Sequence, residues 1–177
     1  VTTAGVVLKG QTVDWSLVLM NVTTLFGFIS PSSYINTGAW SIGNEMFYYA
    51  LTPGLLALYD RNILFGNVVV VVVIMIGGYF GFEVLGTQAT LASQWKIYIN
   101  PLNNMYLYAI GVAMYYNTVG LNLRATSLNA FLLLSVFIFV WYPTAGDLIH
   151  IVTGVERVVF SLASVLLVFV FYKTSIS

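Results

Sequence analysis

Long apolar stretches separated by short polar connections dominate this chain. A helix needs roughly 20 mostly apolar residues to cross a bilayer, and five stretches come close to that length: 41–59, 63–82, 104–120, 126–142 and 155–172. An earlier stretch, 13–29, carries more polar residues and is expected to span the membrane, re-enter it or lie at its surface. Valines at 68–73 would favour a strand, but open sheet is excluded from the bilayer core. The pattern therefore predicts an all-α, polytopic integral membrane bundle of about five to six transmembrane helices.

Composition agrees with this prediction. Of the 177 residues, 59% are hydrophobic and 7% are charged, whereas soluble domains carry about 25% charged residues. Six scattered basic residues form no phosphate-binding stripe, so nucleic acid is excluded as a partner. The sequence has no cysteine and one histidine, which excludes thiolate and multi-histidine metal sites. We expect residues 1–177 to form one transmembrane domain among membrane lipids.

The connections suggest an orientation. Alternating spans place Arg61, Arg124 and Lys173 on one side of the membrane, and Lys9, Lys96 and Arg157 on the other. All four tryptophans fall on the second side, as in an interfacial belt. Two basic residues of the first side lie in very short links, where the positive-inside rule is most reliable. The first side is therefore predicted to be cytoplasmic.

One polar array stands out in the 41–59 stretch. Ser41, Glu45, Tyr48 and Thr52 are spaced 4, 3 and 4 residues apart, which places them on one helical face. Tyr49 borders that face. An ionisable residue inside a span is by default a candidate for function: Glu45 could act as a general base, orient a histidine or bind a hydroxylated ligand. The equally weighted alternative is a polar contact between helices.

Two segments resemble a known family. The sequence WSIGNEMFYY at 40–49, followed by Pro53, resembles the W-S-L-x-x-E-x-x-F-Y-x-x-x-P signature of the acyltransferase 3 family, with Tyr48 in place of Phe. Residues 100–111 resemble the later P-x-x-R-x-x-x-F-x-x-G element, with Asn104 in place of Arg and Tyr108 in place of Phe. Residues 21–26 resemble an apolar stretch that precedes the signature.

The resemblance implies a function. Members of this family are multi-pass membrane O-acyltransferases, which would place the chain in a bacterial inner membrane. They transfer an acyl group, often acetyl, from acyl-CoA to a hydroxyl of a glycan or lipid-linked sugar, and no permanently bound cofactor is implied. In this reading Glu45 orients or charge-stabilises the catalytic base. Substrate binding would fall to Trp40, Ser41, Tyr48 and Tyr49.

Other family elements are absent from the sequence. The family's base is a histidine of an upstream element, and neither that element nor the family's C-terminal motif is present. We therefore expect the sequence, which begins with Val1, to be the central part of a longer acyltransferase domain. Two alternatives stay open. One is a non-catalytic or decayed remnant, and the other is a small transporter or flippase-like protein that uses Glu45 as a relay.

Three further features have two interpretations each. His150 is either an acid–base group or, as we favour, an exposed loop residue. Arg157 could bind acyl-CoA phosphates, but a snorkelling residue at a helix end is favoured. Gly77 and Gly81 form a G-x-x-x-G, which permits close helix approach or marks a turn.

Overall fold

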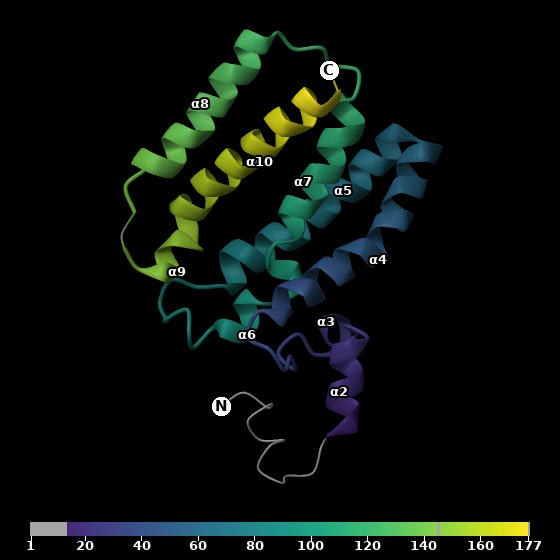
Figure 1. Ribbon diagram of the computed structural model, residues 1–177, viewed down its shortest axis with the longest axis vertical. Coiled ribbons are helices and arrows are strands. Elements are labelled where there is room, and N and C mark those ends of the chain that lie inside the picture. The colour runs from purple at the N-terminus through teal and green to yellow at the C-terminus, as the bar shows by residue number, and fades with distance from the viewer. Residues whose placement is uncertain (1–13, 145, 177) are drawn as a thin grey trace.

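The computed structural model describes residues 14–144 and 146–176. Lys9, which was used to predict the orientation, and residue 13, the first of the 13–29 stretch, lie outside the described residues. All regular elements within the described residues are helices (Figure 1). The α-helices are α2 (Trp15–Val22), α3 (Phe26–Ile29), α4 (Ala39–Arg61), α5 (Ile63–Tyr79), α6 (Trp95–Tyr98), α7 (Met105–Thr118), α8 (Ala125–Trp141), α9 (Leu148–Ile151) and α10 (Gly154–Ile176). A π-helical turn, η1 (Phe80–Val84), extends α5, and a 3₁₀ turn, η2 (Pro101–Asn103), precedes α7. The all-α prediction is confirmed.

The five apolar stretches become α4, α5 with η1, α7, α8 and α10, each within a few residues of its predicted bounds. The valine run lies inside α5, as predicted. The 13–29 stretch behaves differently, because Thr24 adopts a φ of 60° and separates α2 from α3. That left-handed conformation is unfavourable for a residue with a side chain, and it ends the first helix. A single continuous span over this stretch is therefore excluded.

The long helices run back and forth along one direction (Figure 1). α5 packs against α4 and α7, whereas α8 packs against α10, which also touches α7. The α4–α5 link, the α7–α8 loop and the C-terminal end of α10 lie towards one end of the bundle, in the upper part of Figure 1. Elements α6, η2 and α9 lie towards the other end. This alternation matches the predicted grouping of the connections.

Close backbone approaches hold the bundle together. A Cβ atom on Gly77 of α5 would lie 2.6 Å from the backbone nitrogen of Tyr106 in α7. On Gly27 of α3, a Cβ would lie 2.3 Å from the carbonyl oxygen of Gly43 in α4. Side chains at these positions would force the helices apart. Of the two interpretations of the G-x-x-x-G, the close approach is confirmed at Gly77.

Two stretches of the described chain, 63–84 and 154–175, have the length and apolar character of a membrane-crossing helix. α8 is apolar but has 17 residues, and the 14 residues of α7 rise about 21 Å, which is short of a hydrocarbon core of about 30 Å. The described residues thus contain fewer helices with the character of a span than the five to six predicted.

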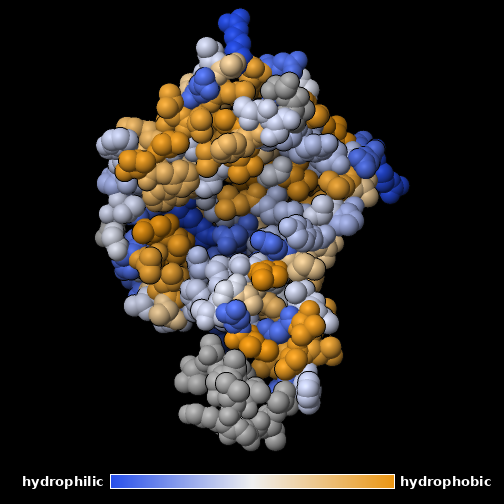
Figure 2. All heavy atoms as spheres, in the orientation of Figure 1, coloured by the Kyte–Doolittle hydropathy of each residue, from blue (hydrophilic) through white to orange (hydrophobic). Residues whose placement is uncertain are grey.

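Many large apolar side chains lie on the outside of the bundle. They come mainly from α5, α8 and α10, and include Leu64, Met75, Leu133, Phe137, Leu162 and Phe171. Figure 2 shows apolar atoms over much of the upper part of the molecule, where α8 and α10 lie. An apolar exterior of this extent fits an apolar surrounding better than water.

Candidate functional site

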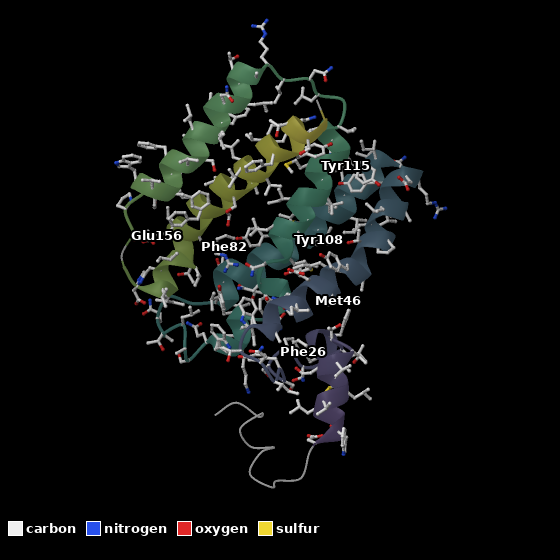
Figure 3. All side chains as sticks on the ribbon, viewed as in Figure 1. Phe26, Met46, Phe82, Tyr108, Tyr115 and Glu156 are labelled. Carbon is white, nitrogen blue, oxygen red and sulfur yellow. The ribbon has the colours of Figure 1, made fainter. Side chains whose placement is uncertain are left out.

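The predicted polar face of α4 contacts two other elements through its inner half. The Tyr48 hydroxyl donates a 2.6 Å hydrogen bond to the carbonyl of Pro101 in η2. One turn further on, the Thr52 hydroxyl lies 2.8 Å from the Tyr108 hydroxyl of α7. The rings of Tyr48 and Tyr108 are stacked, with centroids 5.0 Å apart. Figure 3 shows Tyr108 between α7 and α4. These contacts fix α4 to the turn that starts α7.

The outer half of the same face is open. Glu45 and Ser41 are exposed, and the Ser41 hydroxyl bonds to the Gly38 carbonyl one turn back. Tyr49 is 62% exposed. The interior position expected for these three residues is not observed, because none of the described helices covers the start of α4 on this side. The orienting or charge-stabilising role of Glu45 and the substrate-binding roles of Ser41 and Tyr49 stay predictions.

Trp40 belongs to an aromatic cluster at the start of α4. Its ring centroid lies 5.9 Å from that of Trp95 and 5.7 Å from that of Tyr98, both on α6. The Trp95 indole in turn donates to the Tyr34 hydroxyl at 2.7 Å. Trp40 and Trp95 therefore lie at the same end of the bundle, and the interfacial belt of four tryptophans stays a prediction.

Asn44, beside Glu45 in the chain, was not singled out from the sequence. Its side chain is 5% exposed, and its Oδ1 atom has no hydrogen-bond donor among the described residues. Buried polar atoms are rarely left in this state. The start of α4 therefore contains a buried acceptor that no donor of the described residues satisfies.

The guanidinium of Arg157 is the most highly bonded group of the described structure. It donates to the Gly81 carbonyl at 2.8 Å, the Val152 carbonyl at 3.0 Å and the Tyr106 hydroxyl at 3.1 Å. It also donates to the backbone carbonyl of Asn103 and to the side-chain oxygens of Asn103 and Asn104, at 2.5, 3.0 and 3.1 Å. These acceptors are all neutral oxygens, and they engage all five N–H groups of the side chain.

The favoured interpretation of Arg157 as a snorkelling residue is wrong. The side chain is 6% exposed and points into the bundle, where it lies over the rings of Phe82 and Tyr106, 5.2 and 5.4 Å from their centroids. It turns inward because η1 and η2 direct carbonyl oxygens towards the start of α10. Gly81 makes this possible, since a Cβ there would lie 2.9 Å from the Asn103 carbonyl and 3.0 Å from the guanidinium.

A cavity of about 150 Å³ adjoins the guanidinium. The Tyr106 and Ser161 hydroxyls, 2.6 Å apart, form its polar wall together with Asn104, whereas Ile151 and Phe160 form an apolar wall. Figure 2 shows hydrophilic atoms recessed between apolar ones in the middle of this face. The cavity is smaller than the roughly 300–1,000 Å³ of drug-sized ligand sites, so it has room for one short polar group.

His150 lies outside this arrangement. Its Nδ1 is 3.7 Å from the Asp147 carboxylate, and both side chains are largely exposed. The favoured interpretation is therefore confirmed for the exposure of His150, but the residue lies in the short helix α9 and not in a loop. Within the described residues, no group of three His, Cys, Asp or Glu side chains is placed to hold a metal ion.

Comparisons with protein-family models, curated proteins and solved structures found no match for this chain.

Proposed function

We propose that this chain is a multi-pass membrane O-acyltransferase that transfers an acyl group from acyl-CoA to a hydroxyl of a glycan or lipid-linked sugar in a bacterial inner membrane. The two apolar stretches long enough to span a bilayer and the apolar exterior support the membrane location. The resemblance of the α4 motif supports the reaction.

The observation that carries the proposal is the contact between the two segments with that resemblance. Tyr48 bonds to Pro101 and Thr52 to Tyr108, although the residues of these two pairs are 53 and 56 positions apart in the sequence. The second segment has Asn104 where the family has arginine. Here the Arg157 guanidinium lies 3.1 Å from the Asn104 side-chain oxygen, so a positive charge is present beside that motif position.

In this proposal, Glu45 and Arg157 contribute to acyl transfer in different ways. A hydroxyl is a weak nucleophile, and a base must take its proton as it attacks the acyl carbonyl. The exposed Glu45 carboxylate would stabilise the positive charge that develops on the base, or bind the acceptor. Arg157 has all its N–H groups engaged, so it would contribute electrostatic potential to the adjoining cavity.

The test is acyl transfer in native membranes that contain the full-length protein. Glu45→Gln is compared with Glu83→Gln, which changes another exposed glutamate in the same way. Transfer of radiolabelled acetyl from acetyl-CoA to envelope glycans should fall at least tenfold in Glu45→Gln and stay near normal in Glu83→Gln. Immunoblots of the membrane fraction check that both variants are inserted.

Three outcomes would contradict the proposal. Near-normal transfer by Glu45→Gln would remove the catalytic role of Glu45. A wild-type protein that inserts but transfers no acyl group would favour the non-catalytic alternative. Solute flux that depends on the charge at position 45 and needs no acyl-CoA would favour a transporter.

A further inference from the structure

A second cavity lies at the opposite end of the bundle from Arg157. It has a volume of about 260 Å³ and lies between the α7–α8 loop and the C-terminal end of α10. Asn122, Asn129 and Lys173 supply polar lining, and Leu121 and Leu128 supply apolar lining. No aspartate or glutamate lines it. The cavity therefore combines a cationic wall with an apolar one.

Lys173 is buried in the wall of this cavity, with 6% of its surface exposed. Its ammonium group donates to the backbone carbonyl of Thr118, at the end of α7, and lies 5.2 Å from the centroid of the Tyr172 ring. An ammonium has three N–H donors, and the described residues provide it with this one acceptor. Burying a charged donor is costly unless its donors are satisfied, so an occupant with acceptor oxygens would stabilise it.

The start of α8 faces the same cavity. Ala125, Leu128 and Asn129 of its first turns contribute to the lining. Arg124 occupies the N-cap position and makes no side-chain hydrogen bond to the first turn. The first N–H groups of a helix attract anions. The positive end of α8 and the ammonium of Lys173 thus act on one small volume.

We propose that this cavity binds the phosphate group of an anionic phospholipid. Lys173 and the start of α8 would contact the phosphate, and the leucines would contact the glycerol and the first carbons of the acyl chains. The lipid is favoured over free phosphate because half of the lining is apolar. The cavity also lies at the bundle end predicted to be cytoplasmic, where basic side chains meet anionic lipids. The site is separate from the proposed acyltransferase site.

The experiment is native mass spectrometry of the full-length chain in detergent, titrated with phosphatidylglycerol or phosphatidylcholine. Wild type should bind phosphatidylglycerol more tightly. Lys173→Met should weaken that binding about tenfold, which corresponds to about 1.4 kcal/mol, and Lys173→Arg should retain most of it. Lys96→Met removes an exposed lysine elsewhere and should leave binding unchanged.

A second variant covers the case in which Lys173→Met does not fold. Asn129→Leu alters an exposed lining residue and should also weaken phosphatidylglycerol binding. Equal binding of the two lipids by wild type, or an equal loss in Lys96→Met, would overturn the proposal. An arm with inorganic phosphate distinguishes the source of the phosphate. If the protein binds inorganic phosphate but shows no preference for phosphatidylglycerol over phosphatidylcholine, the assignment of the site to a lipid would be overturned.

Discussion

Gly77 and Gly78 are neighbours in α5, but an added methyl group would meet different surroundings at each. At Gly78 nothing lies within 4 Å of the new Cβ, and the change should stabilise the helix by about 0.5–1 kcal/mol because alanine loses less backbone entropy than glycine. At Gly77 the new Cβ would lie 2.6 Å from the Tyr106 nitrogen. The two helices would have to separate by about 0.8 Å to reach the 3.4 Å of an ordinary contact. Overpacking of this kind costs about 1–3 kcal/mol.

The two substitutions should therefore change the stability in opposite directions and differ by about 1.5–4 kcal/mol. At roughly 2–4 °C per kcal/mol for a protein of this size, their melting temperatures should differ by about 3–16 °C. Intrinsic tryptophan fluorescence of detergent-solubilised protein measures this, because Trp40 and Trp95 lie in a packed cluster. A Gly77→Ala variant as stable as Gly78→Ala would refute the close packing of α5 on α7.

Two further predictions concern Arg157 and Asp14. Arg157→Lys replaces five donors by three and loses at least two charge-assisted hydrogen bonds of about 1.5–3 kcal/mol each. It should therefore lower the melting temperature clearly more than Arg124→Lys, which changes an exposed arginine. Equal effects of the two substitutions would contradict the stabilising role of the hydrogen bonds around Arg157. The Ser16 hydroxyl and then the Leu17 N–H hold the pKa of the Asp14 carboxyl below its ordinary value of 3.8. The ionised cap thus stabilises α2 above that pH, and its contribution is lost as the pH falls through the lowered pKa. The protection factor of the Leu17 amide, which is its exchange rate corrected for the intrinsic pH dependence of exchange, should fall on acidification in wild type but not in Asp14→Asn. A pH-independent protection factor in wild type would contradict the cap.

The long helices were predictable because their signal is local. Apolar length alone located α4, α5, α7, α8 and α10 to within a few residues. The break between α2 and α3 was not predictable, because it depends on a positive φ at Thr24, and threonine carries no preference for that conformation. Apolar character located α4 and α7 in the sequence, but neither is among the helices with both the length and the apolar character of a membrane span.

The hydrogen-bond partners of Arg157 could not be predicted from the sequence for a different reason. Five of its six acceptors lie 51 to 76 residues earlier in the chain. Three of the six are backbone carbonyls, which leave no mark in the residue types. The spacing of Gly77 and Gly81 gave a partial signal, since both positions need the absence of a side chain. The polar face of α4 was predictable only in part. The helical spacing correctly placed its residues on one face, but which half of that face is covered depends on where η2 lies.

The hydrogen bonds around Arg157 also bear on the order in which the helices pack together. The acceptors of these hydrogen bonds come from η1, η2, α7 and the turn before α10, and all four of these segments precede α10 in the chain. A bare guanidinium entering a bilayer carries a large cost, which falls only once those oxygens are in place. We therefore expect the hairpin of α8 and α10 to pack last, against helices that have already formed.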